Sequence, residues 1–447
     1  MPDKTAEILR LFPERARLVP AWLHFVYSHF GERPQPALAM HVLEARPDLV
    51  GEDPMIACAV GDHQSIARAL AADAAALRAA ELQTSNLELR TSAGISWRCP
   101  CGAVFDMPLL IAVTHSSLIR IPRFQGPLRE TARVLLAAGA DPNSTWREGG
   151  GPPLSALYGA AGLHHDAEMT RLLLDAGASP DDGESLYHAF EGDDLSCARL
   201  LLEAGATRSG TNATFRILDL DRLDGLALLL SHGADPNEQS GGLDLPLHHA
   251  IRRRRSPAHF RALLEAGADP RALTSAGISA FVLAHRYGLT EVAALLRAAG
   301  GAEPLPIGEQ FIAACARGDR DTAMTLREQQ PHLPASLSAD QLAQLPNLAA
   351  EAGTGDAIQL MVELGWPVDV RGGIGWVVSA LNHAVARGDP TLTHFLLENG
   401  AKWTEDNGHG SDVSGTLAWA SRQELGAEAD LVACAEALMA HGMPKAR

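Results

Sequence analysis

The sequence predicts an all-α fold in which short pairs of helices stack on one another as a solenoid. Three observations predict it: a Gly-Ala-Asp-Pro-Asn phrase that recurs, a Leu-rich stretch before each copy, and a composition that is 46% hydrophobic but only 5% aromatic. Small apolar side chains suit closely stacked helices. One helical pair cannot bury its apolar stripe alone, so each pair must pack against its neighbours.

The recurring phrase sets the period of the array. Full copies occupy Gly139–Asn143 and Gly233–Asn237, and shorter variants begin at Gly177, Gly205 and Gly267. The marking glycines are therefore 38, 28, 28 and 34 residues apart, close to a repeat of about 33 residues. Further copies follow at Gly300, Gly365 and Gly400.

One copy shows why the phrase ends a helix. Ala132 and Leu135 fall at helical spacing and predict an apolar stripe just before Gly139. Glycine adopts the left-handed conformation that often terminates a helix, without a Cβ penalty. Pro142 then presets φ, and Asn143 can bond its own backbone, which favours a turn. We expect each unit to be helix, turn, helix and an extended finger.

A second phrase precedes the first helix of the unit. Leu245-Pro-Leu-His248 and Pro152-Pro-Leu-Ser155 are its better copies. With both phrases, the chain resembles the ankyrin-repeat proteins, as a degenerate array of bacterial type, from about Met55 to Gly442. The resemblance implies an ankyrin-repeat solenoid with short finger loops. It also implies that histidines at the second phrase bond backbone in the turn between repeats; these are His188, His248 and His383.

The spacing of the phrases predicts the domain organisation. Residues 1–52 lack the phrase and read as a small helical N-terminal cap of short helices separated by prolines. A first repeat block spans 53–303, with a poorly repetitive insertion at about 81–109, and a second block spans 304–442. Gly300 and Gly365 lie 65 residues apart, so a degenerate repeat is expected between them. Residues 443–447 are expected to be frayed.

Charge and hydropathy limit the partners. The net charge of −17 argues against nucleic acid, whose binding requires Lys and Arg to neutralise phosphates. The basic run Arg252–Arg255 is either a solvated helix face or a patch for an acidic partner. No segment reaches the roughly 18 apolar residues of a membrane span, and the N-terminus lacks a signal-peptide core. We therefore expect a cytoplasmic monomer with a protein partner.

Two kinds of cysteine are present: some occupy packing positions inside helices, and one pair lies where a metal site is conceivable. Cys58 and Cys315 occupy matching small-residue positions inside helices. Cys99 and Cys101 lie in the insertion as a single Cys-x-Cys, whereas a zinc site needs four ligands. We expect a β-hairpin or turn here and no metal, although one metal-binding alternative remains open.

No catalytic motif appears in the chain. It has no nucleophile elbow, phosphate-binding loop or His-Glu-x-x-His pair. We therefore expect no catalytic residues, no cofactor and no metal. His164-His165-Asp166 falls between two helices of a repeat, where we expect solvated side chains. Gly372-Gly-Ile-Gly375 reads as a fingertip loop whose glycines give backbone freedom.

The expected functional surface is the fingertips and the exposed side of the first helices. Trp and Arg are enriched at interface hot spots. The finger residues Trp146, Arg147, Trp376 and Trp403 are therefore candidates, although a finger tryptophan can instead fill space between fingers. Three candidates on the first helices complete the set: Tyr158, Tyr187 and Arg253.

The functional prediction is a cytosolic ankyrin-repeat scaffold that binds another protein and catalyses nothing itself. The alternative is an effector or immunity-type protein. In that alternative, the N-terminal segment or the Cys99/Cys101 insertion carries a separate enzymatic or metal-binding activity.

Overall fold

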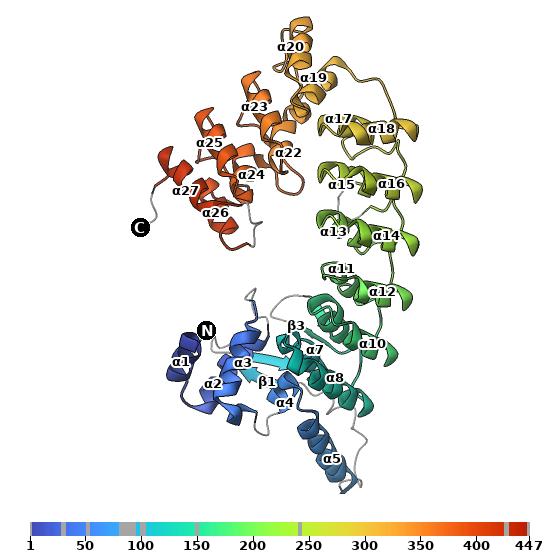
Figure 1. Ribbon diagram of the computed structural model, residues 1–447, viewed down its shortest axis with the longest axis vertical. Helices are drawn as coiled ribbons and strands as arrows, with labels where there is room; N and C mark the ends of the chain where they lie inside the picture. The colour runs from blue at the N-terminus through green and yellow to red at the C-terminus, as the bar shows by residue number, and fades with distance from the viewer. Residues whose placement is uncertain are drawn as a thin grey trace. The chain divides into compact units, whose positions relative to one another are not determined.

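The computed structural model describes residues 2–27, 33–50, 54–79, 95–98, 104–147, 152–239, 244–423 and 429–444. These residues are mostly helical, as predicted (Figure 1). Residue contacts divide the chain into two compact units, Met1–Leu220 with Ser231–Ala234, and Asp221–Leu230 with Asp235–Arg447. The predicted block boundaries rest on the repeat phrase and remain predictions.

Short helices open the first unit, as expected for the N-terminal segment. The ring of Trp22 is fully buried, and its Nε1 donates to the carbonyl of Ala39, which ties α2 to α3. The Tyr27 hydroxyl donates to the Ala112 carbonyl at 2.7 Å, which ties α2 to α7. The bounds are α1 Pro2–Leu11, α2 Arg15–Val26, α3 Pro36–Ala45, η1 Pro47–Leu49, α4 Pro54–Val60 and α5 His63–Ala79.

The insertion contains the expected hairpin. Strand β1 (Ile95–Arg98) pairs antiparallel with β2 (Val104–Met107). Cys99 and Cys101 lie outside the described residues. Helix α7 (Leu109–Thr114) follows the hairpin. A short 3-10 helix, η2 (Ser117–Arg120), connects it to α8 (Pro122–Ala137), and α7 packs against both α4 and α8.

Helical pairs make up the rest of the first unit. The second helices α10 and α12 pack together, and α11 packs against both η3 and α13. A hairpin of β3 (Thr145–Arg147) and β4 (Pro153–Ser155) precedes the first of these pairs. The bounds are α9 Ala156–Tyr158, the π-helical η3 Gly159–Leu163, α10 Ala167–Asp175, α11 Ser185–Ala189, α12 Ser196–Glu203 and α13 Ala213–Asp219.

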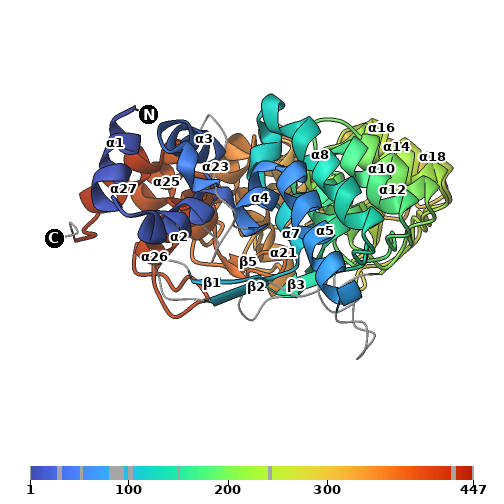
Figure 2. The same ribbon diagram turned by 90° about the horizontal axis from the view of Figure 1, so that it is seen from below.

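The second unit repeats the same arrangement. First helices pack on first helices, α15 on α17 and α24 on α26 (Figure 1). Second helices pack on second helices, α16 on α18 and α25 on α27 (Figure 2 for α16 and α18). Helices α19 to α23 lie between Gly300 and Gly365, the interval in which the sequence predicts a degenerate repeat. The bounds are α14 Leu223–Ser231, α15 Pro246–Arg252, α16 Pro257–Glu265, α17 Ala280–Arg286, α18 Thr290–Ala298, α19 Ile307–Ala316, α20 Arg320–Gln329, α21 Ala339–Leu342, α22 Gln344–Ala349, α23 Gly355–Glu363, β5 Arg371–Gly372, β6 Val378–Ser379, α24 Ala380–Arg387, α25 Pro390–Glu398, α26 Val413–Ala420 and α27 Leu431–Ala440.

The last residue of the repeat phrase links one pair to the next. In the second unit, the Asn237 side chain donates to the Gly267 carbonyl at 2.9 Å and accepts from the Asp269 N–H at 2.8 Å. Asn143 makes the same two bonds in the first unit, at 3.2 Å to the Gly177 carbonyl and 2.7 Å from the Ser179 N–H. The amide therefore satisfies backbone groups of the following turn. The marking glycines adopt positive φ as predicted.

The histidines of the second phrase behave as expected in two of three repeats. His248 Nε2 lies 3.0 Å from the Ala272 carbonyl, and His383 Nε2 lies 3.1 Å from the Gly372 carbonyl. His188 differs. Its ring lies between two carboxylates, 3.4 Å from Glu184 and 3.2 Å from Glu191.

The expectation of solvated side chains at residues 164–166 is wrong. Asp166 is buried and caps α10 by accepting from the Met169 N–H at 2.8 Å. Its carboxylate also pairs with Arg129 at 2.8 Å. Burial lowers the pKa of His164 to about 3, so this ring is neutral. Asp166 is buried because it carries the cap of α10 and an ion pair to α8, whereas His164 and His165 are half-buried.

Candidate protein-interaction surface

The finger between β5 and β6 positions Trp376 in the second unit. Arg371 pairs with Ser379 and Gly372 with Val378, which brings the ends of the loop together. Gly373 has a φ of +125°, and a Cβ there would lie 2.2 Å from the Trp376 carbonyl oxygen. Only glycine fits this tight turn, so the predicted reason for the Gly-rich loop is confirmed.

Trp376 is fixed within this loop by contacts on three sides. Its Nε1 donates to the Asn407 carbonyl at 2.7 Å. Its ring meets His383 edge-on at 5.1 Å between centroids and lies 6.4 Å from the ring of Trp419 on α26. Burial lowers the pKa of His383, so a neutral imidazole supports the indole. These contacts hold the tryptophan in one orientation.

Three exposed apolar side chains neighbour Trp376, two in the same loop and one on α26. The exposed fraction is 54% for Trp419, 53% for Val377 and 45% for Ile374. Single exposed apolar residues are ordinary on protein surfaces, whereas clusters of them commonly mark interaction sites. We call Ile374, Trp376, Val377 and Trp419 the aromatic patch. It lies wholly within the second unit.

Trp419 was missed by sequence reasoning, although the pattern of its helix contains a signal. The buried residues of α26 are Val413, Thr416 and Ala420, which share one face at helical spacing. Trp419 falls off that face, and a large aromatic residue there must meet either solvent or a neighbouring finger. Trp403, the other predicted residue in this region, is half-buried, and its carbonyl accepts from the Val413 N–H at 3.2 Å.

In the first unit, the two predicted finger residues lie on opposite faces of β3. Trp146 is only 8% exposed and pairs in register with Leu154, while Arg147 is exposed and pairs with Pro153. The burial of Trp146 favours the alternative expectation, that its ring fills space within the finger region. A role in partner binding stays a prediction for both residues.

Tyr158 and Tyr187 belong to one ring cluster. Both rings meet His188 edge-on, at 5.3 Å and 4.8 Å between centroids. The Arg216 guanidinium lies 5.8 Å from the centre of the Tyr187 ring and pairs with Glu191 at 2.7 Å. Both tyrosines are half-buried, so the cluster is a partly covered surface of aromatic and charged groups.

Arg253, the remaining predicted residue, is engaged within the second unit. Its Nη1 donates to Glu351 Oε1 at 3.1 Å. Burial raises the pKa of Glu351, and the neighbouring arginine opposes that shift. Its partner Glu351 lies outside the aromatic patch.

Two features of the described residues bear on catalysis and metal binding. No three His, Cys, Asp or Glu side chains among them gather as a metal site requires. Burial raises the pKa of the Cys197 thiol to about 11 and that of Cys315 to about 12. These thiols stay protonated near neutral pH and are poor nucleophiles. Across the same described residues, no helix has the length and apolarity to cross a bilayer.

Comparisons with known proteins give the following. No family model matches the chain, and no curated protein matches it. Among solved structures, it is similar to the human ASB11 ankyrin repeat domain, with 20% identity over 52% of this chain and 99% of that one, at a TM-score of 0.24. A likeness at that TM-score does not assign the chain to a family.

Proposed function

We propose that the chain is an ankyrin-repeat scaffold that binds another protein and catalyses no reaction of its own. Two features support the repeat architecture: the recurring phrase in the sequence, and the Asn143 and Asn237 side chains, which make the same bonds to the next turn in both units. Repeated helical pairs of this kind form extended surfaces suited to binding.

The aromatic patch is the observation that carries the proposal of a protein partner. Tryptophan dominates interface hot spots because it buries a large ring and carries one polar group. Trp376 is pre-oriented by its bond to the Asn407 carbonyl, which reduces the entropy lost on binding. Trp419 supplies exposed apolar area beside it. Apolar side chains recognise the apolar surface of a protein better than a nucleic-acid backbone.

The remaining parts of the proposal concern location and assembly. The described free cysteines, Cys58, Cys197, Cys315 and Cys434, are buried thiols, which suit the reducing cytoplasm. The net charge of −17 favours a partner other than nucleic acid. We propose a cytoplasmic monomer in which the blocks 53–303 and 304–442 are the repeat arrays.

Affinity capture with matched variants tests this proposal. Trp419→Ala removes a hot-spot ring from the patch. Val432→Ala is the control, because Val432 is 71% exposed on α27 and apolar but is not part of the patch. Hot-spot residues contribute about 2 kcal/mol or more, which corresponds to roughly thirtyfold in affinity.

The expected result is a protein captured equally by the wild type and by Val432→Ala and lost with Trp419→Ala. Equal capture by all three proteins would remove the patch from the proposal. A substrate turned over by the purified chain would remove the proposal that it lacks catalysis.

A further inference from the structure

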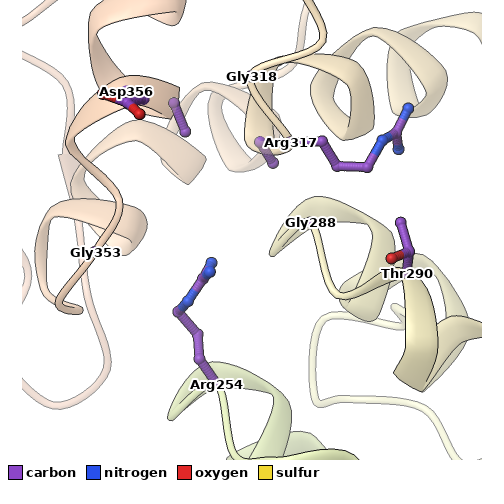
Figure 3. Close-up of a pocket in the computed structure, with 9 residues that line it drawn as sticks. Arg254, Gly288, Thr290, Arg317, Gly318, Gly353 and Asp356 are labelled. Atoms are coloured by element: carbon purple, nitrogen blue, oxygen red, sulfur yellow. The ribbon is translucent and has the colours of Figure 1, made fainter.

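An open pocket of about 550 Å³ lies within the second unit (Figure 3). It forms where the first helix turns into the second in successive pairs, between α15 and α16, α17 and α18, α19 and α20, and α22 and α23. Arg254, Thr290, Arg317 and Asp356 supply its longer side chains, and glycines and alanines supply the rest of its lining. The small residues leave the space open, and the polar residues determine which chemical groups of a ligand can bind there.

Arg254 stands out within the basic run that the sequence left unexplained. Its Nη1 donates to the Tyr287 carbonyl at 2.8 Å. It forms no ion pair with any residue that the structure describes. The other three arginines of the run each have a carboxylate: Arg252 with Asp244 at 2.8 Å, Arg253 with Glu351 at 3.1 Å and Arg255 with Asp221 at 3.0 Å.

The physical state of Arg254 favours an added anion. The side chain is half-buried, and burial lowers the pKa of its guanidinium, while the nearby charge of Glu351, which forms its ion pair with Arg253, partly opposes that shift. A guanidinium carries five N–H donors and no acceptor. One of these N–H groups donates to the Tyr287 carbonyl. The guanidinium points into the pocket (Figure 3). A charged group that has lost water without gaining a carboxylate contact is stabilised by a bound oxyanion.

Two further donors line the facing side of the pocket. The Arg317 side chain runs along that wall beside Thr290 (Figure 3). Its Nη2 lies 3.6 Å from Asp319 Oδ2, which is a loose ion pair. Asp356 lies on another wall and is exposed. Its carboxylate repels a bound anion and so lowers the affinity of the pocket for it. Removing this charge therefore provides a test.

We propose that this pocket binds a small molecule through an oxyanion, a phosphate or a carboxylate, with Arg254 as the principal ligand. Its volume falls in the range of about 300–1,000 Å³ that is usual for small-molecule sites. The site is separate from the aromatic patch and does not depend on the proposed protein partner. It gives a function to Arg254, the one arginine of the basic run that lines the pocket.

Isothermal titration of the full chain with inorganic phosphate and, separately, with succinate tests the proposal and distinguishes the two oxyanions. We expect saturable one-site binding of at least one of them. Arg254→Gln should weaken it at least tenfold, because charge-assisted bonds to an oxyanion are lost. Arg317→Gln should weaken it less, and Asp356→Asn should strengthen it.

The matched control is Arg261→Gln, which removes the same charge from an exposed position on α16 in the same unit. It should leave the affinity unchanged. The proposal is overturned if neither anion binds at concentrations up to about 10 mM. It is also overturned if Arg261→Gln weakens binding as much as Arg254→Gln, or if only an acidic peptide binds. Circular dichroism of Arg254→Gln and Arg317→Gln confirms that each variant is folded.

Discussion

The buried ion pair between Arg286 and Glu309 provides the sharpest test of how neighbouring helical pairs hold together. Arg286 on α17 donates from Nη2 to Glu309 Oε1 at 2.6 Å and from Nε to Oε2 at 2.8 Å, so the pair is bidentate across to α19. Both side chains are almost fully buried. Asp340 and Gln341 of α21 join them, at 2.7 Å to Arg286 and 2.8 Å to Glu309.

Replacing Glu309 with leucine should destabilise the chain severely. Burial lowers the pKa of Arg286, and the hydrogen bonds with Glu309 and Asp340 outweigh that effect and raise it. In Glu309→Leu, the buried guanidinium keeps only Asp340, which is largely exposed. Breaking a buried pair from one side costs about 3–5 kcal/mol, whereas replacing both partners with apolar residues is often nearly neutral. The double variant Arg286→Met, Glu309→Leu should therefore recover most of the loss.

Urea unfolding followed by circular dichroism measures these changes in the free energy of unfolding. Glu363→Leu is the control, because Glu363 pairs with Arg320 on the exposed surface of the same unit, and exposed pairs contribute about 0–1 kcal/mol. The reasoning is refuted if Glu309→Leu loses less than about 1 kcal/mol, or if the double variant is as unstable as the sum of the single variants.

Three further predictions concern a close backbone approach at a glycine, the protonation of a buried histidine, and the hydrogen bonds that link one repeat to the next. Gly288→Ala should be much more destabilising than Gly318→Ala in urea unfolding. Both glycines have positive φ, but a Cβ on Gly288 would lie 2.6 Å from the Ala316 carbonyl oxygen, whereas a Cβ on Gly318 would meet nothing within 4 Å. Equal losses would show that the close approach is unimportant. Burial lowers the pKa of His115 to about 4, below the unfolded value of about 6.5. Between these two pH values the unfolded chain binds a proton that the folded chain does not, so the free energy of unfolding falls as pH drops from about 6.5 to 4. His115→Gln should reduce that slope by about 1.4 kcal/mol per pH unit, and an unchanged slope would mean that the ring ionises in the folded state. Asn237→Ala should lose about 0.5–1.5 kcal/mol, because it removes the hydrogen bonds to the exposed Gly267 carbonyl and from the exposed Asp269 N–H. Hydrogen exchange should rise at residues 267–269, and unchanged exchange there would contradict the linkage.

The helices were predictable because their ends are encoded locally. Gly139 and its counterparts need positive φ, and the sequence reveals that need directly. The bonds of Asn143 and Asn237 to the next turn were not predictable, because they join residues about one repeat apart. The same limit explains the error at residues 164–166, where Asp166 is buried against Arg129 of another helix.

The candidate surface was predictable only in part. Sequence reasoning selected Trp376 because it follows a Gly-rich finger, and the structure places it beside exposed apolar groups. It did not select Trp419, whose position depends on which face of α26 is buried. Trp146 shows the converse, since its finger position did not reveal that the ring would be covered. Exposure depends on neighbouring repeats, and the repeat phrase alone does not specify them.

Hydrogen exchange on the complex with the captured partner tests the central claim most directly. Partner binding through the aromatic patch should slow exchange of the backbone amides in residues 371–379 and 413–420, and Trp419→Ala should abolish that protection. Residues 431–440 of α27, which carry the control residue Val432, should be unaffected. Protection confined to other segments, with residues 371–379 unchanged, would contradict the proposed surface.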